Sequence, residues 1–460
     1  MAAESRPMPS DRRTSSVPRL VLLLAAATAG LLLVGCSGHS ESSDATESAF
    51  SISTLERRAF NYFRDQADPK TGLVADRAIN VGPLQPCGYS SVAATGFGLV
   101  AFCAGVERGW ISHDAAYAQV RKTLRFLWSL KGDDCPHGFY YHWVNPATGK
   151  RSDPNSEVSS IDTAWLLAGA LFAGQYFKGT EVETLARRIY ERTDFPWLLG
   201  RGTGDCANPL ILCHGWTPET GFIPSCWNAY SEHMVLYLLA IGSPTHPIPP
   251  GSWKAWRRTQ ANYKKWRTFV DLPLFAHQFS HCFVDFRNKH DLLGYDYWQS
   301  SVNATIINAQ FCRDQTTAYA TYRNGIWGLS ACDGPSGYRA YRAPPITAIQ
   351  DGTVAPWAVC GSLVFDKDIA QTGYATDLCR TALGKIYTKY GSRIWGRYGF
   401  SDGFNVDKPW YDDQIVGIDA GCGLMMIENA DHHGFVWKYF MALDCIQRAF
   451  ACGFYPCAPG

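Results

Sequence analysis

Residues 156–177 read SEVSSIDTAWLLAGALFAGQYF, and this stretch decides the fold. From Ser160 to Phe177 the sequence is apolar nearly all round a helix of 3.6 residues per turn. Ser159 and Ser160 stand where a helix N-cap is expected. A helix without a polar face has to be buried between neighbouring elements. The stretch therefore predicts an inner helix of a layered helical fold.

Helical periodicity continues along most of the chain. Ser53 with Glu56 predicts a capping box that opens a helix over 55–63, and apolar residues after Ser112 recur every three or four positions. We expect further helices over residues 91–106, 160–177, 182–192, 231–241, 295–311, 354–363, 378–390, 418–426 and 436–449. Because buried and amphipathic helices alternate, the pattern predicts two concentric helical layers in an all-α domain.

Composition limits the classes of partner. The formal net charge is +1 and the Lys and Arg residues are scattered, so the sequence offers no basic patch for nucleic acid. Aromatic residues are frequent instead, with 16 Trp and 23 Tyr, which suits a protein that handles sugar rings. After residue 50 the Pro-rich bend at 244–250 is short enough to be a loop. We therefore predict one domain over residues 51–455. We also expect the protein to be a monomer.

The first residues predict export. Arg6, Arg12, Arg13 and Arg19 precede an apolar run over 20–34, and the run closes with the lipobox-like sequence Leu-Val-Gly-Cys at 33–36. Residues 1–36 are expected to be a lipoprotein signal peptide that ends at a lipidated Cys36, and residues 37–50 a flexible tether. An ordinary signal peptide or an uncleaved anchor is the alternative. The expected location is the membrane, facing the periplasm or the cell surface.

Cysteine and histidine spacing bears on disulfides and metals. Fifteen cysteines follow Cys36, spread from Cys87 to Cys457, which predicts several disulfides in an oxidising compartment and at least one free thiol. No Cys-x-x-Cys pair occurs, which argues against a structural zinc site. His277 and His281 would share one face of a helix, but no third ligand is near them in sequence. We expect both to form structural hydrogen bonds, with no metal and no cofactor.

A first group of acids ends the long loop over 132–157. Asp153, Glu157 and Asp162 meet at the start of the apolar helix that follows. An acid at this position can be an N-cap, which is an equal alternative for Asp162. Glu157 lies beside His142 and Trp143, surroundings in which a carboxylic acid can be kept protonated.

A second group precedes the helix expected at 231–241. Glu232 is preceded by Trp227 and Tyr230 at a loop-to-helix junction, which resembles a sugar subsite. The alternative is an ordinary first-turn glutamate. Because Glu157 and Glu232 belong to different helices, their side chains could face each other across a cleft. A glycosidase needs such a pair, one acid for the leaving oxygen and one base or nucleophile.

Gly-aromatic stretches form a third group. Trp327, Tyr338 and Trp395 are candidates for stacking on sugars, although a place in the core is the more frequent one for any single Trp. Acids that could hold or position a water follow near the C-terminus: Asp412, Asp413 and Asp419. The loops over 132–157, 200–229 and 323–353 are long, and long loops in compact domains are usually functional.

Several motifs in a fixed order resemble the bacterial glucoamylase-like family from about residue 53 to about residue 449. The motifs span 72–77, 91–98, 106–112, 138–142, 156–163, 277–281, 327–330, 333–335 and 395–400. The resemblance implies an (α/α)6 toroid as the single catalytic domain. It also implies a glycoside hydrolase similar to endo-β-1,2-glucanases and to the related domain of cyclic β-1,2-glucan synthases.

The resemblance further implies roles for individual residues. Glu157 and Glu232 are the acid and base candidates, with Asp153 and Asp162 in support, and the scaffold favours an inverting reaction. Residues expected to bind the oligo- or polysaccharide substrate are His142, Trp143, Trp227, Tyr230, Trp327, Asp333, Tyr338, Trp395, Arg397 and Asp419. The chain departs from the family in its cysteines and in the loops at 82–88 and 200–214. A polysaccharide lyase and a non-catalytic surface glycan-binding lipoprotein are the alternatives.

Overall fold

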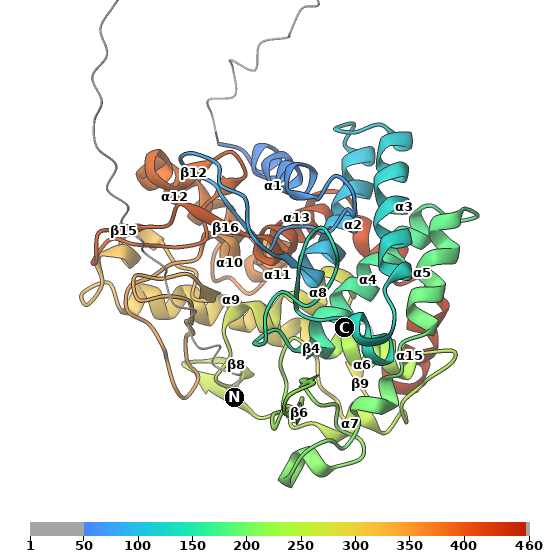
Figure 1. The fold of residues 1–460 in the computed structure, drawn as a ribbon. Helices are drawn as coiled ribbons and strands as arrows, with labels where there is room; N and C mark the ends of the chain where they lie inside the picture. The colour runs from blue at the N-terminus through green and yellow to red at the C-terminus, as the bar shows by residue number, and fades with distance from the viewer. Residues whose placement is uncertain (1–49, 457–460) are drawn as a thin grey trace, which may run out of the picture. The chain divides into compact units, whose positions relative to one another are not determined.

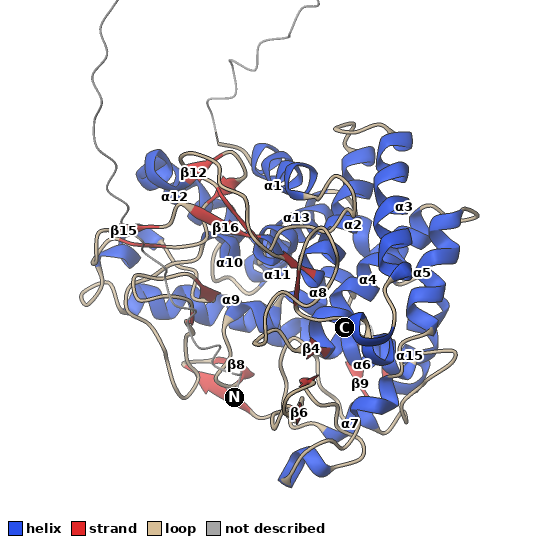
Figure 2. Cartoon of the chain, in the orientation of Figure 1, coloured by secondary structure: helices blue, strands red, loops and turns tan. Residues whose placement is uncertain are grey.

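The computed structural model describes residues 50–456, which are built mainly from helices (Figures 1 and 2). Six helices of this part of the chain form an inner layer, and most of their residues are buried. They are α2 (Val92–Glu107), α4 (Ser160–Tyr176), α6 (Met234–Ile241), α8 (Phe279–Phe283), α10 (Pro356–Cys360) and α13 (Gly417–Asp431). The inner helix expected from the sequence at 160–177 is α4.

An outer layer surrounds the inner one, and along the chain the two alternate except between α6 and α8. It consists of α1 (Ile52–Gln66), α3 (His113–Ser129), α5 (Glu181–Glu191), α9 (Tyr297–Asp314), α12 (Leu378–Ile394) and α15 (Asp444–Gly453). The shorter helices α7 (Ser252–Ala255), α11 (Asp366–Gln371) and α14 (Phe435–Phe440) lie in the connections. In Figure 1, α2 to α5 run alongside one another. This is the predicted all-α (α/α)6 arrangement.

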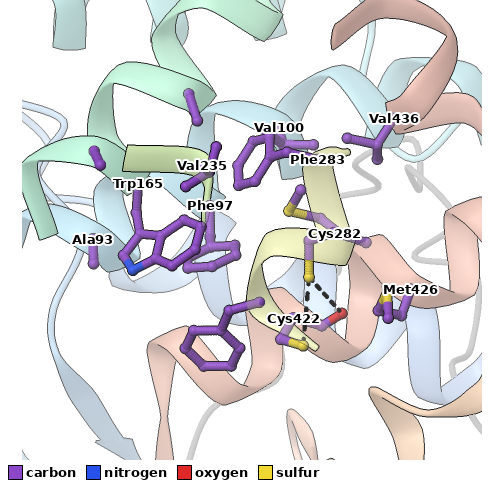
Figure 3. Packing of buried hydrophobic residues seen from close by; sticks show 14 of the residues in the cluster. Ala93, Phe97, Val100, Trp165, Val235, Cys282, Phe283, Cys422, Met426 and Val436 are labelled. Carbon is purple, nitrogen blue, oxygen red and sulfur yellow. Dashed lines mark hydrogen bonds between the residues drawn. The ribbon is translucent and has the colours of Figure 1, made fainter. Parts of the chain in front are cut away.

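Two glycines let neighbouring inner helices touch through their backbones. A Cβ on Gly169 of α4 would lie 2.0 Å from the carbonyl oxygen of Gly96 on α2, and one on Gly96 would lie 2.4 Å from the carbonyl oxygen of Trp165. Only glycine allows this approach. Beside this contact, Phe97 and Trp165 stack with ring centroids 6.1 Å apart, and further buried side chains complete the core (Figure 3).

The strands are short and pair in twos and threes, all antiparallel. The pairs that bear on the site are β1 (Arg77–Ile79) with β16 (Gln414–Val416), β2 (Ser90–Ser91) with β3 (Trp143–Val144), and β4 (Val158–Ser159) with β5 (Gly215–Thr217), which also pairs with β6 (Gly221–Phe222). The others are β7 (Gln260–Tyr263) with β8 (Trp266–Phe269), β9 (Lys289–Asp291) with β17 (Phe454–Pro456), β10 (Ala331–Cys332) with β11 (Arg339–Ala340), β12 (Trp395–Gly396) with β13 (Gly399–Phe400), and β14 (Phe404–Asn405) with β15 (Trp410–Tyr411).

Some helix boundaries differ from those expected. The N-cap of α1 is Ser51, whose side chain accepts a hydrogen bond from the Thr54 amide, so the predicted Ser53 capping box is wrong. Glu56 points into the core instead, with 1% of its surface exposed. The helix predicted over 436–449 is divided into α14 and α15.

The two histidines at 277 and 281 do not share one helix. His277 ends a 3-10 turn, and α8 begins two residues later, after Gln278. Both rings are buried, and burial lowers the pKa of each to about 3, so they are neutral. The predicted structural hydrogen bonding is confirmed for His281, whose Nε2 lies 2.9 Å from Ser301 Oγ.

Disulfides are fewer than expected within residues 50–456. Cys206 and Cys226 form one, in the long loop before α6. The other twelve cysteines of this segment are thiols, and ten of them are buried. Most therefore act as small apolar core residues, which accounts for their number without cross-links. Cys282 of α8 and Cys422 of α13, for example, have sulfur atoms 3.5 Å apart in the core (Figure 3).

The predicted signal peptide, Cys36 and the tether up to residue 49 lie outside the described residues. Between residues 50 and 456, no helix combines the length and the apolar character needed to span a bilayer. The proposed domain boundaries stay predictions.

Candidate active site

Short strands connect the segments that lead into three inner helices. β16 pairs with β1, and Ala75 pairs with Ser90 at the start of β2. β2 pairs with β3, Tyr141 pairs with Val158 of β4, and β4 pairs with β5. The segments before α13, α2 and α4 are therefore joined side by side. Acidic side chains follow directly in the first turns, Asp162 in α4 and Asp419 in α13. The N-terminal ends of helices favour negative charge, which helps to hold both acids there.

Backbone pairing brings Glu157 to His142. Because Tyr141 pairs with Val158, His142 lies opposite Glu157, and its amide donates to the Glu157 carbonyl over 2.8 Å. Side chains of opposed residues project to the same face of a sheet. His142 Nδ1 accordingly lies 3.2 Å from Glu157 Oε1, and His142 Nε2 lies 3.6 Å from Asp162 Oδ1. The imidazole stands between two of the predicted catalytic acids.

The contacts of His142 with Glu157 and Asp162 shift the pKa values of all three side chains. Desolvation alone would lower the pKa of His142, but the charges of Asp162 and Glu157 raise it to about 10. Burial would raise the pKa of Glu157, yet the His142 cation brings it below its ordinary value. The expectation that these surroundings keep Glu157 protonated is therefore wrong. Asp162 differs, because burial raises its pKa above the ordinary value despite His142.

Asp162 combines capping with this contact. Ser159 is the N-cap of α4; its hydroxyl accepts from the Asp162 amide and donates to the Asp162 carboxylate. Asp153 behaves differently. Its carboxylate accepts from the Asn155 amide at 2.8 Å and from the Ser152 hydroxyl at 3.1 Å, within its own turn. The structure does not bring Asp153 to the His142 group through any described hydrogen bond or ion pair.

Glu232 lies at the start of the neighbouring inner helix. It precedes α6 by two residues, and its carboxylate accepts from the Ser231 hydroxyl. Ser280 anchors this turn, because its hydroxyl donates to the Glu232 carbonyl at 2.6 Å and accepts from the Val235 amide at 3.2 Å. Burial raises the pKa of Glu232, and the charge of Asp162 raises it further. The structure thus brings Glu232 within electrostatic reach of the first group.

A second acidic group lies on the C-terminal part of the chain. Ligand oxygens of Asp333, Asp402 and Asp412 are within 4.8 Å of one another, and the Asp333 amide donates to Asp402 Oδ2 at 2.8 Å. Arg77 on β1 donates from Nη1 to Asp333 Oδ2 at 2.8 Å. Burial raises the pKa of Asp402, with the charges of Asp419 and Asp333 adding to it.

Asp412 of this group and the neighbouring Asp419 also have raised pKa values. Burial, with the charges of Asp402 and Asp333, raises the pKa of Asp412 to about 8. Burial and its neighbours raise the pKa of Asp419 to about 8. One oxygen each of Asp402, Asp412 and Asp419 is buried without a hydrogen-bond partner in the protein. Such groups in a folded protein call for a functional explanation.

Asp76 and Arg77 join the two groups. Asp76 Oδ1 accepts from the indole nitrogen of Trp143 at 3.0 Å, and its other oxygen lies 3.3 Å from Arg77 Nε. Trp143 stacks on His142, with ring centroids 3.8 Å apart and planes at 16°. Through these contacts the first group connects to Asp333 and the second.

Several predicted binding residues take other positions. Trp327 is 2% exposed and Tyr230 is 4% exposed, and the Tyr230 ring stacks on Phe269 in the core, so neither can stack on a sugar. Burial thus contradicts the stacking role expected of Trp327, whereas the substrate contact expected of Tyr230, which was not a stacking candidate, stays a prediction. Trp227 is 6% exposed and donates from Nε1 to Ser160 Oγ at 2.9 Å, so it supports the start of α4.

Residues of the Gly-aromatic stretches differ in their positions: some make structural contacts and one is exposed. The Trp395 ring packs edge-on against Phe400, and the Arg397 guanidinium donates to the carbonyl oxygens of Ile79 and Gly82 at 2.7 and 2.8 Å. Both hold structure together. Tyr338, by contrast, is 42% exposed and lies close to the second acidic group, since the charges of Asp419 and Asp402 act on its hydroxyl. It is available for stacking.

Sequence reasoning gave no role to Asp76, Arg77 and Asp402, and grouped Asp412 only as a possible water holder. These residues are distant in sequence from Glu157, and long-range pairing of β1 with β16 brings them together. The signal that could have pointed to them is the motif order, because Asp76 and Arg77 end the first motif and Asp402 follows the last.

Three groups of described residues have ligand atoms within 4.8 Å of one another: Glu56 with Glu428 and His432, His142 with Glu157 and Asp162, and Asp333 with Asp402 and Asp412. Each group already contains or contacts a cation of the protein. His142 is charged within its own group, Arg77 pairs with Asp333, and Arg108 Nε lies 3.6 Å from Glu428 Oε1. The protein thus supplies positive charge where a metal ion would otherwise do so.

Comparisons with known sequences agree with this arrangement. The family model described as "Putative glucoamylase" matches residues 224–444. The exo beta-1,2-glucooligosaccharide sophorohydrolase (non-reducing end) of Parabacteroides distasonis is 25% identical over 440 residues, which cover 86% of this chain. The chain spans 57% of the length of that curated relative.

Two solved structures share the fold with this chain over nearly their whole length. A Bacteroides uniformis protein with the same glucoamylase description superposes with a TM-score of 0.77 at 27% identity, over 89% of this chain and 99% of its own. The endo-beta-1,2-glucanase of Chitinophaga pinensis, in complex with sophorotriose and glucose, gives a TM-score of 0.76 at 26% identity, over 88% of this chain and 99% of its own. The predicted resemblance and the predicted fold are confirmed.

Proposed function

Because this chain resembles the glucoamylase-like family in sequence and fold, we propose that it is a glycoside hydrolase that cleaves a β-1,2-glucan. One observation carries the proposal. Glu157 and Glu232, at the starts of the adjacent inner helices α4 and α6, have pKa values shifted in opposite directions. Two carboxyl groups with opposed shifts are what acid–base cleavage of a glycosidic bond requires.

The shifts assign a role to each glutamate. Glu157, whose pKa is lowered by His142, is the ionised base that removes a proton from the attacking water. Glu232, whose pKa is raised by burial, is the acid that gives its proton to the leaving glycosidic oxygen. As the water oxygen bonds to the anomeric carbon, the carbon–oxygen bond to the leaving sugar breaks. Proton exchange with solvent then restores both groups.

We infer an inverting, endo-acting enzyme. Inversion requires room for a water beside the base, with the two carboxyl groups about 6.5–9.5 Å apart. Endo action is supported by the match to the endo-acting Chitinophaga pinensis enzyme, which this chain covers over 99% of its length. The exo-acting relative from Parabacteroides distasonis is covered over only 57%.

The lyase alternative receives little support from the site. Elimination from a uronic acid needs a cation that is free to neutralise the substrate carboxylate. Arg77 and His142, the cations that the described residues bring among these acids, each face carboxylates of the protein. Their charge is already balanced.

Substitution of the two glutamates tests the proposal. Glu157→Gln and Glu232→Gln should each lower kcat on β-1,2-glucan by about 1000-fold, while Tm changes by no more than about 3 °C. Reducing ends released by the wild type and both variants are the measurement. Glu219→Gln serves as the matched control, because the Glu219 side chain is half exposed and its ion pair with Arg151 involves neither Glu157 nor Glu232.

The outcomes distinguish a hydrolase from a glycan-binding protein and from a lyase. Full activity in both variants would remove the catalytic assignment. Glucan binding by the wild type without release of reducing ends would favour a glycan-binding protein, and ultraviolet absorbance from an unsaturated product would favour a lyase. A product series of mixed length supports endo action, whereas sophorose alone would overturn it.

We also propose that the protein is exported and anchored by a lipid on Cys36, as the sequence at 33–36 suggests. Replacement of Cys36 by Ser should move the protein from the membrane fraction to the soluble exported fraction. Retention of the variant in the membrane would contradict the lipid anchor.

A further inference from the structure

Both ring nitrogens of His142 face protein carboxylates. Nδ1 lies 3.2 Å from Glu157 Oε1 and Nε2 lies 3.6 Å from Asp162 Oδ1, and about a quarter of the side chain is exposed. A carboxylate on each side of an imidazole stabilises the cation, which carries a proton on each nitrogen. Neither nitrogen is then left to bind a sugar hydroxyl, which was the role expected from the sequence.

The backbone holds His142 in this position. The residue after it, Trp143, lies opposite Ser156 in the same strand pairing. The Trp143 amide donates to Ser156 Oγ at 2.9 Å, and the Ser156 hydroxyl donates back to the Trp143 carbonyl at 2.8 Å. On the other strand, Gly215 packs against Glu157, because a Cβ there would lie 3.2 Å from Glu157 Cγ. The His142–Glu157 pair is therefore confined on both sides.

A second contact holds the ring itself. The Trp143 indole lies over the imidazole at a centroid distance of 3.8 Å, and an aromatic face attracts a cation. The indole nitrogen is tied in turn to Asp76 at 3.0 Å, and Asp76 pairs with Arg77. Asp76 thus fixes the indole, and the indole fixes the imidazole.

We propose that His142 is a positioning residue that holds Glu157 and Asp162 in place, and that the Trp143–Asp76 pair holds His142. The inference rests on the proposed function of Glu157 as the base. It deepens that function, because it explains how an acid at a partly buried position remains ionised. His214, the other histidine near Glu157, cannot substitute, since burial lowers its pKa to about 4 and keeps it neutral.

The inference predicts a specific change in the pH profile. Without the His142 cation, the pKa of Glu157 should rise, so that the base becomes ionised only at higher pH. The acid limb of kcat/KM should therefore move to higher pH in His142→Asn. We expect kcat/KM to fall about 10-fold at pH 5 and much less at pH 8, with KM changed less than about threefold.

Trp143→Phe is the matched variant. Phenylalanine keeps an aromatic ring over His142 but loses the hydrogen bond to Asp76. Its pH profile should shift in the same direction and by less. A shift larger than that of His142→Asn would contradict the proposal that Trp143 acts on Glu157 through His142.

A measurement without substrate tests the histidine directly. In wild-type protein labelled with ¹⁵N-histidine, the His142 ring should remain doubly protonated through neutral pH, whereas an ordinary histidine titrates near 6.5. The signal is assigned by its loss in His142→Asn or, should that variant fail to fold, in His142→Gln. Titration of His142 near its ordinary pKa would overturn the inference.

The outcomes distinguish this inference from the proposed function. If the wild type releases no sugar, the function fails while the histidine titration still decides the state of His142. If the wild type is active and Glu157→Gln is not, an unchanged pH profile in His142→Asn overturns the positioning role. A raised KM with an unchanged profile would show that His142 contacts the sugar.

Discussion

The two ends of α13 carry acids with raised pKa values under opposite conditions. Asp419 stands in the first turn, where the helix dipole favours negative charge, and it is partly exposed. Glu428 stands near the last turn, where the dipole disfavours negative charge, and none of its surface is exposed. The two are nine residues apart, which is about 14 Å along a helix. Burial raises the pKa of Asp419 to about 8 and that of Glu428 to about 7.

The surroundings of Glu428 are those of a closed structural contact. Glu56 on α1 lies beside it, and burial raises the pKa of Glu56 to about 9. Arg108 approaches Glu428 at 3.6 Å and donates to His432 Nδ1 at 2.7 Å. The pKa of His432 is lowered by burial and by Arg108, so its neutral ring donates from Nε2 to Glu56 Oε2 at 3.3 Å. One arginine faces two buried carboxyl groups whose pKa values are both raised, and the cluster ties α1 to α13.

The comparison teaches that a raised pKa alone does not identify a catalytic acid. Both ends of α13 carry an acid with a raised pKa. Asp419 is itself partly exposed and lies close to the exposed Tyr338, whereas Glu428 and its neighbour Glu56 are fully buried. Accessibility separates a group that can exchange protons with a substrate from one that only stabilises packing.

The largest expected difference between the ends is in activity. Asp402→Asn, at the Asp419 end, should lower kcat/KM about 100-fold with little change in Tm, because the amide oxygen can still accept from the Asp333 amide while the carboxyl group that interacts with Asp419 is lost. Glu428→Gln should leave kcat/KM within about twofold of the wild type. Steady-state kinetics of the two variants measure this difference in kcat/KM. Equal losses of kcat/KM in both variants would contradict the difference proposed between the two ends of α13.

A smaller effect, on stability, is expected at the other end. Arg108→Leu removes the cation that balances Glu56 and Glu428, and breaking a buried pair in this way costs about 3 kcal/mol. Tm should fall by roughly 5–10 °C in a thermal melt. Arg187→Met is the control, since the Arg187–Glu191 pair is exposed and contributes little. An Arg108 variant as stable as this control would contradict the structural role of the cluster.

The smallest effect is a dependence of stability on pH. The folded-state pKa values of Glu56 and Glu428 lie above the unfolded value of 4.5, so the folded protein binds these protons more tightly. Their stabilising contribution is complete below pH 4.5 and is lost as the pH rises through about 7 and then about 9. Glu56→Gln should remove part of this loss. The difference in Tm between this variant and the wild type should change by roughly 5 °C between pH 5 and pH 9. A constant difference would mean that the pair does not share a proton.

The sequence predicts the helical layers well because burial leaves a direct mark on composition. Ser160 to Tyr176 lacks a polar face, and the structure buries it. The end of a helix is decided by single hydrogen bonds, so Ser51 could take the cap that Ser53 was expected to form. A ring such as Trp327 looks the same in sequence whether it faces a ligand or the core, and only packing decides.

The site was predicted in part for a similar reason. Glu157, Asp162 and Glu232 could be found because each lies next to a helix start in sequence. Arg77 and Asp402 depend on pairings between distant strands, which local patterns do not encode. The protonation of Glu157 follows from one such pairing, between the strands that carry residues 141 and 158.

The scarcity of accessible thiols has a practical consequence. Of the twelve thiols between residues 50 and 456, Cys452 is exposed and Cys87 is partly exposed, while the rest are sheltered. Cys87 lies close enough to Tyr89 for its charge to act on the tyrosine hydroxyl, next to Asp76 and Arg77. A maleimide dye attached there, with Cys36, Cys452 and Cys457 replaced by Ser, would put a fluorescent reporter beside the acids without any engineered cysteine.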